Sequence, residues 1–130
     1  EKLEKEIKRL EEKEIVLVFG AGGDRDRAKR PKMGAMAQRY AKKIIVTSDN
    51  PRSEEPDAII SEILAGMHES PSLHVKADRL QAITEALAIR EKDEVVLILG
   101  KGDETYQEIK GVKYPFDDRV VVRELLAKLG

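Results

Sequence analysis

Three short runs of apolar and β-branched residues constrain the fold of this chain more than any other feature. They occupy residues 15–19, 44–47 and 95–99. Gly20 follows the first run and Gly100 follows the third, where a buried strand would stop. Runs this short, with no alternating polar positions, are typical of strands that are buried on both faces of a sheet. A weaker strand candidate spans residues 73–75.

Helical patterns lie between the predicted strands. Pro31 and Pro56 suit the first turn of a helix, Asp78 with Gln81 resembles a capping box, and Asp118 is expected to cap the last helix. The predicted helices cover residues 1–13, 31–42, from 56, 78–88 and from 118. Alternating strands and helices indicate an α/β fold, a three-layer, doubly wound, mostly parallel Rossmann-like sheet. Two runs around Lys110-Gly111 predict a small C-terminal β-hairpin.

The composition excludes several classes of protein. The chain has 130 residues, which favours one domain over residues 1–130. Its 24 basic and 25 acidic residues argue against binding to nucleic acid through bulk positive charge. Cysteine is absent, so neither disulfides nor thiolate chemistry is available. Since the chain has no membrane-length apolar run and no signal-like N-terminus, we predict no membrane partner and a cytoplasmic location.

The first loop, residues 20–30, combines glycines with basic side chains. Residues 24–32 carry five basic and two acidic side chains, a local excess of three positive charges. Glycines let backbone N–H groups approach a ligand, and the following helix N-terminus adds partial positive charge. The spacing matches neither a dinucleotide fingerprint nor a P-loop. The loop is therefore a candidate phosphate or carboxylate site, with a tight turn bearing solvated charges as the alternative.

Two further loops follow predicted strands. In the second loop, residues 48–55, Pro51 favours an extended Asn50, and Arg52 offers a planar fork for a carboxylate. In the third loop, residues 100–105, Glu104 could accept an ammonium group. Each loop taken alone is also explained as a rigid connection. In doubly wound sheets, however, ligands bind beyond the carboxyl ends of the strands, where the three loops would meet.

Other chemistry finds no support in the sequence. His68 and His74 lack metal-ligand spacing. There is no GxSxG motif and no cysteine nucleophile. We therefore predict no catalytic residue and no metal site in this chain.

Taken together, the three loops resemble one family. FGAGGDRDRAKRP, TSDNPRSEEP and GKGDETYQEI, followed by PFDDR, are similar in order and spacing to the C-terminal domain of the Mur ligases. The resemblance covers nearly the whole chain from Ile15 and is greatest to the branch that adds the third residue of the peptidoglycan stem peptide. It implies an enzyme that uses ATP and Mg²⁺ to join a diamino acid to UDP-N-acetylmuramoyl-L-Ala-D-Glu. The C-terminal domain of such an enzyme delivers the amino acid.

The resemblance also implies roles for single residues. Within the family the DNPR form of the second loop goes with meso-diaminopimelate as the amino acid. Arg52 is then expected to bind its distal carboxylate with help from Asn50 and Arg25, while Gly100 and Glu104 hold the distal ammonium group. The residues expected to face the nucleotide are Asp24, Arg27, Lys29 and Arg30.

This sequence departs from the family pattern in several places. The family's first strand, DYAHTPD, is absent, as are its central ATPase domain and its UDP-sugar domain. Asp103 stands where the family has a histidine, and Ala21 stands where it usually has a cysteine. We therefore expect a domain that binds diaminopimelate, does not catalyse ligation in isolation and binds no ATP or Mg²⁺ tightly. The missing strand would leave a sheet edge open for self-association.

Two alternatives remain open at this stage. One is an engineered or truncated α/β scaffold that keeps the motifs without an activity. The other is a small anion-binding module that depends on the positive charge of the first loop.

Overall fold

The computed structural model describes residues 14–100 and 104–129 of the chain. Over these residues four parallel strands form one sheet in the order β3-β2-β1-β4, so β1 has a neighbour on each side. The strands are β1 (Glu14–Phe19), β2 (Lys43–Val46), β3 (Leu73–Val75) and β4 (Glu94–Ile98). All four predicted strands are therefore confirmed. The predicted helix over residues 1–13 and the departure at Asp103 lie outside the described residues.

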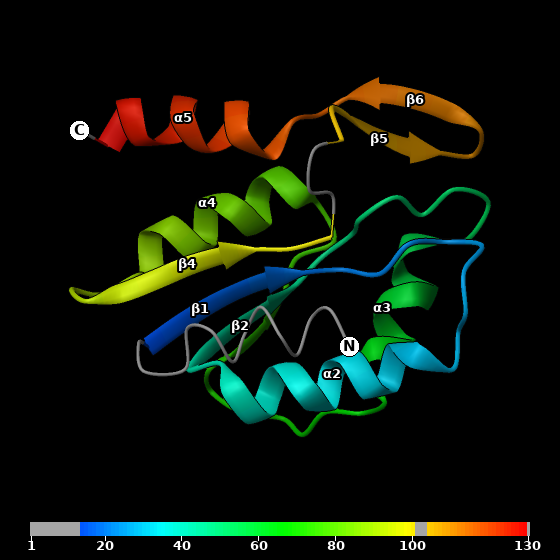
Figure 1. Ribbon diagram of the computed structural model, residues 1–130, viewed down its shortest axis with the longest axis horizontal. Coiled ribbons are helices and arrows are strands. Elements are labelled where there is room, and N and C mark those ends of the chain that lie inside the picture. Colours follow the sequence, from blue (N-terminus) through cyan, green and yellow to red (C-terminus); the bar gives the residue numbers. More distant parts are fainter. Residues whose placement is uncertain (1–13, 101–103, 130) are drawn as a thin grey trace.

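Helices cover both faces of the sheet, which confirms the three-layer arrangement. Figure 1 shows α2 and α3 on one side of the sheet and α4 and α5 on the other. Their bounds are α2 (Lys29–Tyr40), α3 (Pro56–Leu64), α4 (Arg79–Ile89) and α5 (Asp118–Leu129). Pro56 is the first residue of α3, as predicted, whereas α2 already begins at Lys29, ahead of Pro31.

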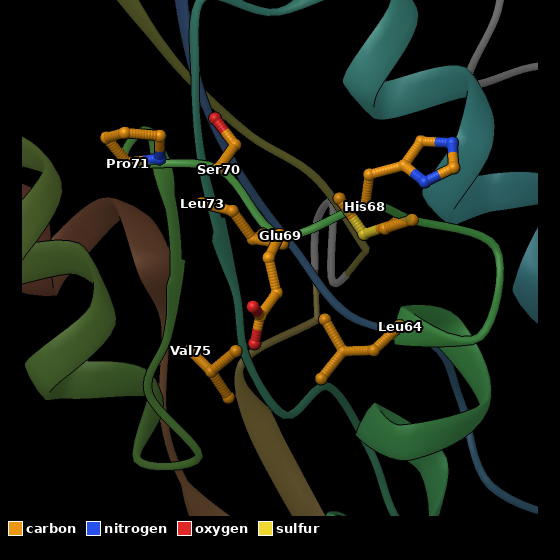
Figure 2. A pocket seen from close by; sticks show the side chains of 8 residues that line it. Leu64, His68, Glu69, Ser70, Pro71, Leu73 and Val75 are labelled. Carbon is orange, nitrogen blue, oxygen red and sulfur yellow. The ribbon is translucent and has the colours of Figure 1, made fainter.

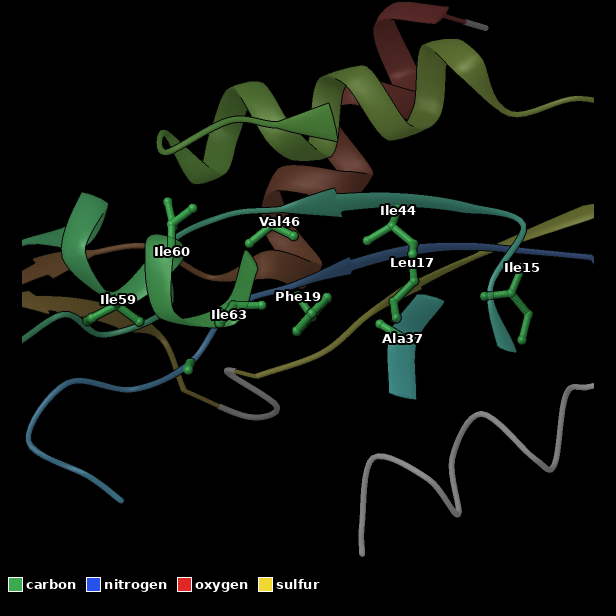
Figure 3. Close-up of a cluster of buried hydrophobic side chains, with 10 residues drawn as sticks. Ile15, Leu17, Phe19, Ala37, Ile44, Val46, Ile59, Ile60 and Ile63 are labelled. Atoms are coloured by element: carbon green, nitrogen blue, oxygen red, sulfur yellow. The ribbon is translucent and has the colours of Figure 1, made fainter. Parts of the chain in front are cut away.

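The core consists of two clusters that share β1, because its successive side chains point to opposite faces. The cluster under α2 and α3, drawn in Figure 3, contains Ile15, Leu17, Phe19, Ala37, Ile44, Val46, Ile59, Ile60 and Ile63. The cluster under α4 contains Val16, Val18, Ile45, Ala82, Ile83 and Ala86. Since each face of β1 meets a helical layer, no position from 15 to 19 can be polar without burying an unpaired group. That requirement explains the uninterrupted apolar run in the sequence.

The helix caps agree with the sequence in one case and correct it in the other. Asp78 caps α4, where its carboxylate accepts a hydrogen bond from the Gln81 backbone N–H at 3.1 Å. For α5 the prediction of Asp118 was wrong by one position. The Asp117 carboxylate accepts from the Arg119 N–H at 2.9 Å, and the Val121 N–H donates to the Asp117 carbonyl. Asp118 instead turns inward and is 8% exposed.

The predicted hairpin is present as a separate two-stranded antiparallel sheet. It consists of β5 (Tyr106–Ile109) and β6 (Val112–Pro115). Lys110 and Gly111 both have positive φ, 51° and 80°, which is the conformation that a two-residue type I′ turn requires. In Figure 1 the hairpin lies beyond the carboxyl ends of the main strands, on the same side as the three loops.

Within the described residues, β3 and β4 form the two edges of the main sheet. The four described strands follow one another in the sheet without a gap. No helix in residues 14–100 and 104–129 has the length and apolar character needed to cross a membrane.

Candidate functional site

The three loops predicted to carry function meet at one edge of the sheet. They follow β1, β2 and β4, which are adjacent and parallel, so their carboxyl ends point the same way. The chain leaves β1 toward β2 on one side, while β4 lies on the other, and ligands of doubly wound folds bind at such a reversal of strand order. The described part of the third loop comprises Gly100 and Glu104 to Thr105, because residues 101–103 lie outside the described ranges.

Two glycines of the first loop allow it to pack directly on the second loop. A Cβ atom added to Gly20 would lie 2.4 Å from the Thr47 carbonyl oxygen, and one added to Gly23 would lie 1.8 Å from that of Pro51. The Gly23 N–H donates to the Asn50 carbonyl at 2.7 Å. These glycines thus serve contact between the loops, where the sequence suggested close approach to a ligand.

Gly22 has a different environment, because two arginine side chains lie over it. A Cβ atom added there would lie 2.9 Å from Nη1 of Arg52 and 3.4 Å from Cγ of Arg25. The structure therefore brings together the two arginines that the sequence assigned to a carboxylate. Arg25 is exposed, and among the described residues its guanidinium has no hydrogen-bond or ion-pair partner.

The Arg52 side chain is held by one edge of its guanidinium group. Nη1 donates to the carbonyls of Gly23 at 3.0 Å and Asn50 at 3.4 Å. Nε lies 3.6 Å from a carboxylate oxygen of Glu108. Nη2 has no hydrogen-bond partner in the described part of the chain. Because Nη1 is fixed while Nη2 is open, the group is oriented and still able to bind an anion.

The hairpin holds the Arg52 backbone in an unusual conformation. Arg52 has φ +54°, a region that costs free energy for a residue with a side chain. Its N–H donates to the Glu108 carbonyl at 2.9 Å, and its carbonyl accepts from the Lys110 N–H at 2.6 Å. The second loop thereby pairs with β5 through a parallel bridge between Arg52 and Ile109. These bonds supply the compensation that such a conformation needs.

Asn50 connects all three parts of the site. Its side chain is 1% exposed; Oδ1 accepts from the Glu108 N–H at 2.7 Å, and Nδ2 donates to Glu104 Oε1 at 2.8 Å. The backbone carbonyl of Asn50 accepts from the first loop, as described above. The second oxygen of Glu104 has no partner among the described residues. Glu104 is thus oriented by Asn50 and keeps one oxygen for a cationic group.

Gly100 lies next to Asp49 at the start of the third loop. Its φ of +118° is one that residues with a side chain rarely adopt, and an added Cβ would lie 3.2 Å from Asp49 Oδ2. Beside it, Gln107 of β5 donates to the Asp49 carbonyl at 2.7 Å and to Ser48 Oγ at 3.2 Å. The hairpin therefore fixes the start of the second loop as well as its DNPR segment.

Of the four residues predicted to face a nucleotide, Asp24, Arg27 and Arg30 have partners within the chain. Arg30 is 1% exposed and donates to the Gly22 carbonyl at 2.9 Å. It also pairs with Glu54 at 2.8 Å and Glu62 at 3.1 Å. Arg27 pairs with Glu62, the Asp24 carboxylate accepts from Ser53, and Lys29 is exposed.

These contacts hold the carboxylates in their charged form. Hydrogen bonds from Arg30 and from the Asp24 backbone lower the pKa of Glu54 to about 2. A hydrogen bond from Arg27 lowers the pKa of Glu62. The positive charge of Arg27 and Arg30 is thus compensated inside the chain. The described residues also form no group of three His, Asp or Glu side chains suited to a metal ion. We derive no step through a nucleotide or a metal ion.

Glu54, Glu62 and Glu108 were not among the residues predicted to form the site. The available signal for the first two was charge, because three excess positive charges in a chain of net charge −1 require compensation nearby. Glu54 lies in the second loop, which was already expected to meet the first. Glu108 had no such signal, since its position follows from the register between β5 and the second loop.

A separate groove lies along the β3 edge of the sheet. It has a volume of about 630 Å³ and is lined by the residues shown in Figure 2, which come from the end of α3, the segment after it and β3. None of the predicted site residues lines it. The groove is therefore distinct from the site that the three loops form.

Comparison with known proteins agrees with this geometry. The profile of the family described as Mur ligase, glutamate ligase domain, matches residues 1–102. A protein of Helicobacter hepaticus named UDP-N-acetylmuramoyl-L-alanyl-D-glutamate--2,6-diaminopimelate ligase is 60% identical over 113 residues, 87% of this chain and 24% of the relative. A protein of the same name from Aquifex aeolicus is 53% identical over 119 residues, 92% of this chain and 25% of the relative.

A solved structure of a ligase with that name is also similar. It has a TM-score of 0.91 and 40% sequence identity, and the match covers 98% of this chain and 27% of that chain. The chain thus spans about a quarter of the length of the relatives that it matches.

Proposed function

Because this chain belongs to the Mur ligase family, we propose that it is the C-terminal, amino-acid-binding domain of a peptidoglycan-precursor ligase, with meso-diaminopimelate as its ligand. The relatives described above are named as 2,6-diaminopimelate ligases. Arg52 and Arg25 bind the distal carboxylate of the ligand, and Glu104 and Gly100 bind its distal ammonium group. Asn50 holds Arg52 and Glu104 in register.

The observation that carries the proposal is that open groups of opposite charge lie on the two sides of Asn50. On one side, Arg25 and Arg52 converge on Gly22, with Nη2 of Arg52 open. On the other side, Glu104 keeps one carboxylate oxygen for a cation. One end of a zwitterionic amino acid carries a carboxylate and an ammonium group on the same carbon, so it complements this arrangement.

The same chemistry accounts for a preference over lysine. Lysine lacks the distal carboxylate, so its binding would leave Nη2 of Arg52 without a partner. A site that is built to pair a charged group discriminates strongly against an analogue that lacks the group. Arg rather than Lys suits this position, because Nη1 can bond the Gly23 and Asn50 carbonyls while Nη2 of the same rigid group stays open for a carboxylate.

We propose that ligation itself lies outside this chain. Phosphoryl transfer needs a phosphate cradle and Mg²⁺ ligands, and Arg27 and Arg30 of the first loop already pair with Glu62 and Glu54. The contribution of this chain is to hold the amino acid by its distal end and so to leave the reacting amine free. We also propose a cytoplasmic location and self-association through a sheet edge. A molecular mass that stays monomeric at all concentrations would contradict self-association.

A calorimetric titration of this chain with meso-diaminopimelate, and in parallel with L-lysine, tests the proposed function. We expect heat and saturable binding with the first ligand and none with the second at equal concentration. A chain that melts cooperatively but binds neither ligand would contradict the proposal and favour an inert scaffold. Equal binding of both ligands would contradict the carboxylate role. Binding of phosphate without either amino acid would favour an anion-binding module.

A further inference from the structure

A buried charged pair lies outside the proposed site. Arg79, the first residue of α4, is 1% exposed, and Asp118, the first residue of α5, is 8% exposed. The guanidinium group donates two hydrogen bonds to the carboxylate, from Nε at 2.8 Å and from Nη2 at 2.7 Å. The pair joins the two helices that cover one face of the sheet, close to the carboxyl ends of the strands (Figure 1).

Arg79 also donates hydrogen bonds to the backbone where two of the site's loops begin. Nη1 donates to the Ser48 carbonyl at 2.9 Å, and Nη2 donates to the Leu99 carbonyl at 3.2 Å. Ser48 begins the second loop, and Leu99 directly precedes the third. Because β1 lies between β2 and β4, one guanidinium group spans the end of β1 and links the two loops on either side.

Stability alone is a weak explanation for such a pair. Replacing a buried ion pair by well-packed apolar groups is often neutral or stabilising, because burying charge carries a desolvation cost. The directions of the bonds suggest a more specific role. Three nitrogens in one rigid plane hold Asp118 and two carbonyls at fixed separations, which the single ammonium nitrogen of a lysine cannot do. The separation fixed in this way is the one between the loop of Asn50 and Arg52 and the loop of Glu104.

We propose that Arg79, supported by Asp118, is a positioning residue that sets the distance between the carboxylate-binding and ammonium-binding halves of the site. The inference rests on the proposed function. Arg79 touches no ligand and affects the affinity for it by fixing the backbone where the second and third loops begin. Asp118 acts by neutralising and orienting the guanidinium group, so that its remaining donors point at Ser48 and Leu99.

The test compares Arg79→Lys and Asp118→Asn with Glu94→Gln. Glu94 belongs to a second buried ion cluster at the amino end of the same sheet, where it pairs with Lys43 at 3.0 Å and Lys42 at 3.1 Å. Glu94→Gln is the matched control, because it weakens a buried ion cluster far from the loops. Each variant is first melted, and variants that are fully folded at the titration temperature are compared. If Arg79→Lys does not fold, Asp118→Asn tests the same ion pair.

We expect Arg79→Lys and Asp118→Asn to weaken diaminopimelate binding on the order of tenfold or more, as misplacement of binding groups does. Glu94→Gln should leave the affinity unchanged. A purely structural role of Arg79 would lower the melting temperature without changing the affinity of the folded protein. Unchanged affinity in both variants would overturn the inference and leave the proposed function intact.

A second readout needs no ligand. The side-chain amide of Asn50 bonds Glu104 across the two loops, so its NMR shift and hydrogen exchange report their separation. We expect this amide to shift and to exchange faster in Arg79→Lys, and to stay unchanged in Glu94→Gln. If the parent chain does not bind diaminopimelate, the proposed function fails. If the NMR shift and hydrogen exchange of the Asn50 amide are unchanged in Arg79→Lys, the inference about Arg79 fails, whatever the outcome of the binding experiment.

Discussion

At the scale of single residues, the site depends on positions that leave no room for one additional carbon atom. Gly22 is the clearest case, because an added Cβ would lie 2.9 Å from Nη1 of Arg52. We expect Gly22→Ala to displace this guanidinium group and to weaken diaminopimelate binding about tenfold, as loss of a charge-assisted hydrogen bond does. Gly111→Ala is the control; its φ of +80° makes it costly by about 1 kcal/mol, yet it lies in open space. Calorimetry with equal affinities for the two variants would contradict this role of Gly22.

Glu54 gives a prediction about pH. Its pKa is about 2 in the folded chain against an ordinary 4.5, so its contribution to stability is full above pH 4.5 and is lost as the pH falls toward 2. Glu54→Gln should therefore unfold at lower urea concentrations at neutral pH, and should approach the parent near pH 2. The control is Glu55→Gln, since Glu55 is exposed and pairs with the exposed Lys110. A constant difference between Glu54→Gln and the parent from pH 7 to pH 2 would argue against this contact.

At the scale of elements, the hairpin is the support for the second loop. The side-chain amide of Gln107 donates to both the Asp49 carbonyl and Ser48 Oγ. Gln107→Ala should remove the hydrogen bond to the Asp49 carbonyl and speed hydrogen exchange at the Arg52 amide by about fivefold, the equivalent of one lost hydrogen bond. Val112→Thr, on the exposed outer strand of the hairpin, should not affect that amide. Equal exchange rates in the two variants would show that the loop is rigid without the hairpin.

The elements also show which parts of the structure local sequence can predict. The strand at residues 14–19 and the hairpin turn at Lys110-Gly111 were predictable, because burial on two faces and positive φ leave local signatures. The pairs Arg30–Glu54 and Arg79–Asp118 join residues that are 24 and 39 positions apart, and no local pattern encodes such contacts. The cap of α5 was misplaced because Asp117 and Asp118 are equivalent in the sequence, and only tertiary packing separates their roles.

At the scale of the whole molecule, the sheet separates two kinds of ionic structure. Glu94, Lys42 and Lys43 tie together the amino ends of the strands, and the Glu91 backbone N–H with the two lysines lowers the pKa of Glu94 to about 2. The carboxyl ends carry the arginines and carboxylates of the loops. The resemblance in the sequence predicts which residues of this second set would touch a ligand, and that assignment stays a prediction. It did not identify the residues that hold them, because those contacts depend on how the three loops pack.

The proposed function depends on Arg52 recognising a carboxylate that lysine lacks. The most direct measurement is a calorimetric cycle of the parent chain and Arg52→Gln against meso-diaminopimelate and L-lysine, with Arg39→Gln on the exposed face of α2 as the control. We predict that Arg52→Gln weakens diaminopimelate binding by roughly tenfold to a hundredfold, removes the preference over lysine and leaves the fold intact, while Arg39→Gln changes neither. An unchanged preference for diaminopimelate in Arg52→Gln would contradict the account.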